Sequence, residues 1–215
     1  MLNMIYMKSF GSKPWMLPQP VLIIGTYNED GTPNAMNAAW GGIHDTNQIG
    51  ICLSPEHKTV KNILDRKAFT VSMADAKHVV ACDFVGIVSG NKDPEKMQKS
   101  GFTVSKSDIV DAPVINELPM ALECRLVSYD EDSGYMVGDI VNVCADEDVL
   151  TDGKIYKGTT TETASKIVTC SNTGDAYVGV ASMRAASSYQ RRVAGEPCTG
   201  GRSRPTQRQR VRRHR

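Results

Sequence analysis

The segment from Asn34 to Trp40 carries side chains that suit ligand binding better than core packing. Its residues are small or bear amides, apart from Met36 and the closing tryptophan, and Gly41-Gly42 follows. Small side chains let a flat ligand approach the backbone, and a Gly-Gly pair at a strand end is typical of a bulge or a sharp bend. Met36 and Trp40 taken singly also suit core or interface positions. The first candidate binding residues are Asn34, Met36, Asn37, Ala38 and Trp40.

A second candidate site lies between residues 53 and 62, where Ser54, His57, Lys58 and Thr59 gather at the expected start of a helix. The free N–H groups and the dipole of a helix N-terminus attract an anion by roughly 0.3–1 kcal/mol, so a phosphate would bind well there. A structural interpretation fits the same residues: Ser54 or Thr59 caps the helix, and His57 is solvated. The pattern alone leaves both interpretations open.

A third candidate is the small polar loop before the next expected helix. It contains Ser89, Gly90 and Lys92, so a lysine and flexible backbone could supply a further anion contact. Such a loop on its own is typical of an ordinary turn before a helix. Its combination with the small-residue strand and the helix start is what favours a binding function.

Several common catalytic motifs are missing from the chain. It has no GxGxxG after its first strand, no GxxxxGK[ST], no Ser-His-Asp pattern and no HExxH. Its four histidines are scattered, and its six cysteines show no CxxC pairing. We therefore assign no catalytic side chain and no metal ligand, and expect an organic cofactor. The cysteine usage argues against a disulfide framework and fits a reducing cytosol.

The pattern of apolar residues predicts a mainly β chain. Strands are expected at 21–27, 33–40, 48–53, 68–73, 120–129 and 135–145, with shorter ones at 166–170 and 175–180. Short helices are expected at 58–67, 77–84 and 93–100. Asp30-Gly31 and the segment 130–134 have the composition of hairpin turns. The prediction is an antiparallel barrel with a few short covering helices and no Rossmann sheet.

The charge distribution separates a body from a tail. The 215 residues carry a net charge of +1, but ten of the 25 Lys and Arg are arginines between Arg184 and Arg215, where Glu196 is the single acid. The body therefore has 15 basic and 23 acidic residues. We expect one domain over residues 1–181 and a disordered or atypical tail over 182–215. Polyanion binding by this tail is the alternative, and nucleic acid is the less expected partner.

The N-terminus has no apolar run of signal-peptide length, and no later stretch is long enough to span a membrane. We therefore expect a cytoplasmic protein that does not bind membranes.

Four stretches taken in order resemble one known family. They read PVLIIGTYNEDGTPNAMNAAWGGI, LSPEHKTVKNI, FVGIVSGNKDPEKM and LPMALECRLV with GDIVNV. Their order is similar to that of the flavin reductase-like FMN-binding split barrels, and in particular to the flavoredoxin branch. The resemblance covers residues 7 to 150. It implies a homodimer of antiparallel split barrels that binds FMN noncovalently near the subunit interface.

The resemblance also implies roles for the candidate residues. Asn34, Met36 and Trp40 would line the flavin, beside the main chain of Asn37 and Ala38. The phosphate would be held by Thr59 with Ser54 and His57, facing a loop formed by Ser89, Gly90 and Lys92.

Three features depart from the family pattern. Ala38 stands where family members often have threonine, and the neighbourhood of Ser133 lacks a histidine that many members carry. The arginine-rich C-terminus replaces the aromatic strand and glycine-containing helix with which members end. Bound flavin is therefore a firmer expectation than efficient turnover.

The resemblance implies an FMN-dependent oxidoreductase of the flavin reductase or flavoredoxin type. NADH, NADPH or a redox protein would pass reducing equivalents to the flavin, and a small molecule or partner protein would accept them. The alternative is an FMN-binding electron-carrier module with little intrinsic NAD(P)H turnover.

Overall fold

The computed structural model describes residues 7–16 and 18–151, with short strand segments at 154–155, 169–170 and 177–178. Its centre is a seven-stranded antiparallel sheet in the order β3-β2-β6-β9-β10-β5-β4. The strands are β2 (Leu22–Tyr27), β3 (Pro33–Ala38), β4 (Gly41–Asp45), β5 (Gln48–Cys52), β6 (Ala68–Met73), β9 (Met120–Asp130) and β10 (Tyr135–Ala145).

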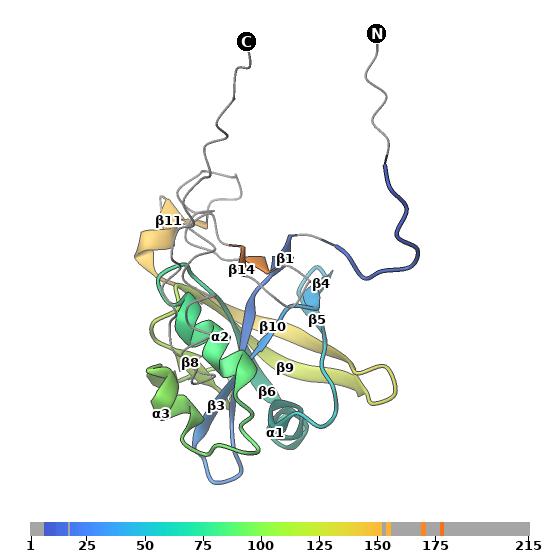
Figure 1. The fold of residues 1–215 in the computed structure, drawn as a ribbon. Coiled ribbons are helices and arrows are strands. Elements are labelled where there is room, and N and C mark those ends of the chain that lie inside the picture. Colours follow the sequence, from blue (N-terminus) through green and yellow to red (C-terminus); the bar gives the residue numbers. More distant parts are fainter. Residues whose placement is uncertain (1–6, 17, 152–153, 156–168, 171–176, 179–215) are drawn as a thin grey trace, which may run out of the picture.

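The sheet curls because its two edge strands are consecutive in the chain. β3 and β4 lie at opposite ends of the strand order, yet only Ala39 and Trp40 separate them. Neighbouring Cα atoms are about 3.8 Å apart, so two residues cannot cross a flat seven-stranded sheet. A Cβ on Gly41 of β4 would lie 2.9 Å from Cδ1 of Leu22 in β2. The sheet is therefore a curled half-barrel, which confirms the antiparallel barrel expected from the sequence (Figure 1).

Three short α-helices cover this sheet. They are α1 (Lys58–Arg66), α2 (Val79–Ile87) and α3 (Lys96–Ser100), and a 3₁₀ turn, η1 (Glu147–Val149), follows β10. α1 ends at Lys67, whose positive φ of 57° lets its N–H donate to the Ile63 carbonyl at 2.8 Å. In Figure 1, α2 and α3 lie together on one side of the sheet and α1 lies on another.

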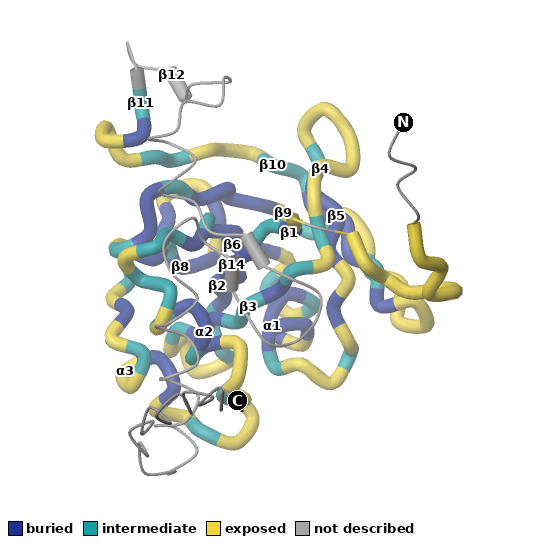
Figure 2. Tube along the Cα trace, turned by 45° about the horizontal axis from the view of Figure 1, so that its top comes forward, coloured by how far each residue is buried: buried dark blue, intermediate teal, exposed yellow. Residues whose placement is uncertain are grey.

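The helices seal two apolar clusters on opposite faces of β2. Leu22 and Ile24 belong to the cluster inside the curl, which α1 closes with Val60 and Ile63. The alternate residues Val21 and Ile23 pack outward with residues of α2 and α3. This two-residue alternation places buried side chains on both faces of the strand, as its continuous apolar run predicts. The buried course of β2 and β6, and of the first half of β9, is visible in Figure 2.

Some details differ from the sequence prediction. Gly41 and Gly42, expected to form a bulge or bend, begin strand β4, and the bend lies at Trp40. α3 begins at Lys96 because the carboxylate of Asp93 accepts the Glu95 N–H at 3.0 Å in a preceding turn. A small hairpin of β7 (Val104–Lys106) and β8 (Pro113–Ile115) was not expected.

The remaining strands are very short. They are β1 (Gln19–Pro20), β11 (Leu150–Thr151), β12 (Lys154–Ile155), β13 (Thr169–Cys170) and β14 (Tyr177–Val178). β13 and β14 fall within the ranges expected to hold short strands. The expected tail over 182–215 lies outside the described residues, so it stays a prediction. Within the described part of the chain, no helix is long and apolar enough to cross a membrane.

Candidate functional site

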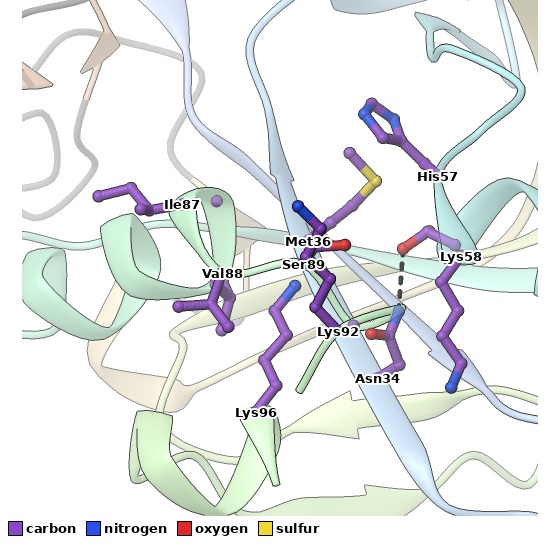
Figure 3. Close-up of a pocket in the computed structure, with 13 residues that line it drawn as sticks. Asn34, Met36, His57, Lys58, Ile87, Val88, Ser89, Lys92 and Lys96 are labelled. Atoms are coloured by element: carbon purple, nitrogen blue, oxygen red, sulfur yellow. Dashed lines mark hydrogen bonds between the residues drawn. The ribbon is translucent and has the colours of Figure 1, made fainter. Parts of the chain in front are cut away.

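A cavity of about 320 Å³ opens beside β3, where the start of α1, the end of α2 and the loop before α3 meet. The predicted residues that line it are Asn34, Met36, His57, Thr59, Ser89, Gly90 and Lys92. Figure 3 shows His57 and Lys58 on the α1 side of Asn34, with Val88, Ser89 and Lys96 on the other side. The three segments that the sequence suggested separately therefore form one site, which we call the cationic cavity.

A buried polar network fixes the wall that β3 and α1 share. The Asn34 amide donates to the Thr59 hydroxyl oxygen at 2.9 Å and lies 3.4 Å from that of Thr26. Asn62 donates to the same Thr26 oxygen at 3.0 Å and to Asn28 at 2.9 Å. Because the Thr59 oxygen accepts from Asn34, its own O–H is left to donate to a ligand.

The start of α1 is shaped for an anion and lacks a side-chain cap. His57 is the N-cap residue and makes no capping hydrogen bond, so the capping interpretation of Ser54 and Thr59 is wrong. The N–H groups of Val60 and Lys61 both donate to the His57 carbonyl, at 3.1 and 3.3 Å, and so begin the hydrogen bonding of the helix. The N–H groups of Lys58 and Thr59 precede them, and a bound anion can accept from such donors.

The loop from Ser89 to Lys92 forms the opposite wall of the cavity. A hydrogen bond connects this loop to the segment just before α1. The Asn91 amide donates to the Glu56 carbonyl at 3.0 Å, and the Lys92 N–H donates to the Ser89 carbonyl at 3.0 Å. A Cβ on Gly90 would lie 2.5 Å from Oδ1 of Asn34. Glycine is therefore required at position 90 for the loop to approach β3 this closely.

The cavity carries a concentrated positive charge. Lys58, Lys92 and Lys96 line it together with His57, and none of its described lining residues is acidic. Lys96 is only 4 % exposed, and its ammonium makes no ion pair or hydrogen bond to the described part of the chain. Burial lowers the pKa of its ammonium to about 8. An unpaired buried cation that lines a cavity points to an anionic ligand.

Sequence reasoning missed Lys96 and the apolar part of the cavity wall. Lys96 is one of three lysines between positions 92 and 99, and nothing in their spacing shows which is buried. The missed apolar wall consists of Val85, Ile87 and Val88, with Gly86 between them. Val85 and Ile87 lie in the last turn of α2, which was expected to end at residue 84.

Four predicted residues lie outside this cavity. The Asn37 side chain donates to the Cys82 carbonyl in α2 at 3.2 Å, and Ala38 is buried in the core. Ser54 is exposed, and its carbonyl accepts the His57 N–H at 3.2 Å. Trp40 lines a separate cavity near the N-terminal arm. Roles of these four in ligand binding stay predictions.

The residues that line the cationic cavity have the chemistry that could bind a phosphate monoester. A compact dianion placed there would meet the N–H groups of a helix start, the Thr59 hydroxyl and the lysine ammonium groups. The walls contain no carboxylate to repel it. These side chains could bind and orient such a ligand.

Comparison with known proteins gives a consistent family assignment. The model of the "Flavin reductase like domain" family matches residues 15–165. A flavoredoxin structure from Desulfovibrio vulgaris (Miyazaki F) is 31 % identical, with a TM-score of 0.74, over 83 % of this chain and 95 % of that one. An FMN-binding domain of a flavin reductases-like enzyme from Shewanella baltica has a TM-score of 0.66. It is 17 % identical and covers 76 % of this chain and 87 % of its own, so it supports the fold alone.

The sequence relatives are less informative. A protein of unassigned function from Aeropyrum pernix is 28 % identical over 115 residues, which are 52 % of this chain and 44 % of that protein. The chain spans about half the length of the curated relatives it matches. The family model matches well over half of the chain, in the region that contains both the half-barrel and the cationic cavity. The chain therefore belongs to the family of flavin reductase like domains, an FMN-related oxidoreductase family.

Proposed function

We propose that this protein binds FMN and passes reducing equivalents from NADH, NADPH or a redox protein, through the flavin, to a small molecule or partner protein. The observation that carries the proposal is the cationic cavity, where a buried unpaired lysine and a helix N-terminus face each other without an acidic residue between them. The 31 % identity to a flavoredoxin supports the same function.

The residues present fit the phosphate end of FMN. Lys96 is a buried cation without a partner among the described residues, and Gly90 leaves open a space that a Cβ would close against Asn34. Lys96 and Lys92 would neutralise the phosphate, while Thr59 would donate its hydroxyl. Charge-assisted hydrogen bonds of this kind are shorter and stronger than neutral ones.

Strand β3 offers the remaining surface that such a ligand needs. It is the edge strand of the sheet and pairs only with β2 in the described strand order, so half of its backbone polar groups point away from the sheet. The main chain of Asn37 and Ala38 lies on this edge, beyond the cavity residues Asn34 and Met36. We propose that it hydrogen-bonds the ligand, as the family resemblance implies.

The chain's own residues position the cofactor. Bound FMN supplies the redox chemistry, and the protein binds and orients it. Asn34 holds Thr59 in place, the tied loop fixes Lys92, and the apolar side chains of Met36, Ile87 and Val88 exclude water. Thiol redox chemistry has less support, because burial raises the pKa of Cys82 and Cys124 to about 12.

We also propose that the protein is a homodimer, as the family resemblance implies. Apolar side chains exposed on the curled sheet support this. They are Ile43, Val127, Val141 and Val143, on β4, β9 and β10. Contiguous exposed apolar surface is typical of protein interfaces. Sedimentation equilibrium would test the proposal, and a monomer at all concentrations would contradict it.

The functional proposal is tested by reconstitution. Purified protein is mixed with FMN, separated from free ligand and examined for a protein-bound flavin spectrum. NADH or NADPH is then added without oxygen. Rapid bleaching is expected. Bound flavin that neither nucleotide reduces would support the alternative carrier function, and a protein that takes up no FMN would contradict both.

A further inference from the structure

Asn62 is a buried polar residue that follows Thr59 by three positions on α1. The two residues are 6 % and 2 % exposed, and both belong to the buried side of the helix. Residues three positions apart in an α-helix lie on the same side of it. Thr59 lines the cationic cavity and Asn62 does not. An uncharged side chain in this position can affect a ligand in the cavity only through other side chains.

A chain of hydrogen bonds connects Asn62 with Thr59. One N–H of the Asn62 amide donates to the Thr26 hydroxyl oxygen at 3.0 Å. The Asn34 amide donates to the same oxygen at 3.4 Å and to the Thr59 hydroxyl oxygen at 2.9 Å. The Thr26 oxygen therefore accepts from both amides, and it joins the side chain on α1 to the one on β3.

A second branch of hydrogen bonds holds Asn62 from the other side. Its other N–H donates to Oδ1 of Asn28 at 2.9 Å. The Asn28 amide donates to the Thr32 hydroxyl oxygen at 2.9 Å, and the Thr32 O–H donates to the Asp30 carboxylate at 2.6 Å. The hydrogen bonds from Thr32 lower the pKa of Asp30, so this carboxylate is ionised at neutral pH.

The ionised carboxylate sets the direction of this branch. A carboxylate without a proton can only accept, so the Thr32 hydroxyl must donate to it, and the Thr32 oxygen is left to accept from Asn28. Asn28 then turns its own oxygen toward Asn62, which must supply an N–H. The amide nitrogen of Asn62 is therefore held in place to donate to Thr26 as well.

We propose that Asn62 is a positioning residue for the phosphate site. It holds Thr26 where the Thr26 oxygen receives the Asn34 amide, and Asn34 in turn fixes the Thr59 oxygen as an acceptor, so that the Thr59 O–H is presented to the phosphate. This inference rests on the proposed function. It assigns to a residue outside the cavity part of the preference for a phosphate-bearing flavin.

The first test is Asn62→Leu, which keeps the approximate size of the side chain and removes both N–H groups. We expect the Kd of FMN to rise about three- to fivefold. The Kd of riboflavin, which lacks the phosphate, should stay the same. The loss should remain below the roughly tenfold loss expected from removing the Thr59 hydroxyl, because Asn62 acts through that group. Fluorescence titration with each flavin measures the two constants.

The same substitution in the Thr59→Val protein separates positioning from a general structural role. Without the Thr59 hydroxyl nothing is left to position, so Asn62→Leu should cause no further rise in the Kd of FMN there. A merely structural role would weaken FMN by the same factor in both proteins, and would weaken riboflavin as well.

Thr26→Val is an independent test, which remains available if Asn62→Leu fails to fold. Valine keeps the shape of threonine and removes the oxygen that both amides share. The variant should weaken FMN by about the same factor as Asn62→Leu, and the two changes together should weaken it no more than either alone.

Asn116→Leu is the matched control. Asn116 also makes two side-chain hydrogen bonds, with the hydroxyls of Thr103 at 3.0 Å and Ser105 at 2.7 Å, and it does not line the cationic cavity. Loss of this asparagine should leave the Kd values of FMN and riboflavin unchanged.

The outcomes separate the two proposals. Protein that takes up no FMN would contradict the proposed function. Bound FMN with an unchanged Kd in both Asn62→Leu and Thr26→Val would overturn the positioning role and leave the proposed function standing. A loss in Asn62→Leu that riboflavin shares, or that adds in full to the loss in Thr59→Val, would also overturn it.

Discussion

The cationic cavity and the cavity beside the N-terminal arm, which Trp15, Gln19 and Trp40 help to line, differ in how the chain holds them in place. The first is cross-linked by side chains: Asn34 to Thr59, Asn62 to Thr26, and Asn91 to Glu56. The second is bounded by the arm over residues 7–16, in which the ring centroids of Phe10 and Trp15 lie 5.1 Å apart and the Met16 N–H donates to the Pro14 carbonyl at 3.2 Å.

The difference indicates a division of labour in binding. Groups held by hydrogen bonds before the ligand arrives lose little conformational entropy when it binds. We therefore expect the cationic cavity to supply most of the affinity for FMN. Changes there should weaken the binding of FMN and leave that of riboflavin, which lacks the phosphate, unchanged.

The largest effect is expected for Lys96→Met. A hydrogen bond to a charged group contributes about 1.5–3 kcal/mol, so the Kd of FMN should rise about 10- to 100-fold while that of riboflavin stays the same. The ligand-free protein should gain thermal stability, because an unpaired buried ammonium is removed. Isothermal titration and thermal melts measure the two quantities.

Lys99→Met is the matched control for this change. Lys99 is on the same helix, is 48 % exposed, and pairs with Asp93 at 2.9 Å and Glu95 at 3.1 Å. The Lys99→Met variant should leave FMN affinity unchanged. If Lys96→Met and Lys99→Met lost FMN affinity equally, the ligand would be attracted by the overall positive charge of the surface and not by the cationic cavity.

Thr59→Val should have the next largest effect. It keeps the shape of the side chain but removes the hydroxyl, so FMN affinity should fall about tenfold. Thr59→Ser retains the donor and should bind nearly as well as the native protein. If valine and serine gave the same Kd by fluorescence titration, the hydroxyl would have no role in phosphate binding.

FMN affinity should fall about five- to tenfold between pH 7 and pH 9. The Lys96 pKa of about 8 means that the ligand-free cavity loses a proton in this range, whereas a bound dianion retains it. His57, Lys58 and Lys92 face Lys96 across the cavity. Lys96→Met should abolish most of this dependence, and a pH profile identical in the variant would assign it to another group.

The stability of the ligand-free protein should change in the opposite direction. The folded pKa of Lys96 lies below its ordinary value of 10.5, so the unfolded chain binds more protons between about pH 8 and 10.5. The contribution of Lys96 to stability is therefore unfavourable below pH 8 and improves as the pH rises through this window. Comparing chemical denaturation of the native protein and Lys96→Met isolates this contribution.

The smallest effect is expected for Asn91→Ala. It removes the hydrogen bond that ties the loop to the Glu56 carbonyl, an exposed contact of about 0.5–1 kcal/mol. FMN affinity should fall about threefold, with riboflavin unaffected. A loss as large as that of Thr59→Val would show that the loop is held almost wholly by this bond.

The sequence was informative where a local pattern sufficed. The β2–β3 hairpin followed from Asp30-Gly31 between extended segments, and α1 followed from the spacing of Val60, Ile63 and Leu64. The part of the cationic cavity at the start of α1 was predicted from the sequence, because the free N–H groups of any helix start favour an anion. Thr59 could therefore be identified without knowledge of the rest of the fold.

The features that sequence reasoning missed depend on tertiary contacts. Lys96 is buried because α3 starts late and packs against α2, and neither fact is encoded in the lysine's neighbours. β4 begins at two glycines that disfavour strands, and it forms through its pairing with β5. Sequence reasoning did not single out Gln19 and Trp15, since nothing local shows that the arm returns to Trp40.

The edge position of β3 also has a consequence for solubility. An edge strand with unpaired backbone groups is a template onto which another chain can add, and proteins normally cover or charge such edges. None of the β3 residues is exposed, but the unpaired edge of the strand carries the small residues that would admit a flat ligand, so bulky protection is missing there. A cofactor lying along this strand would therefore also act as an edge cover, and the ligand-free protein should be the form more prone to self-association.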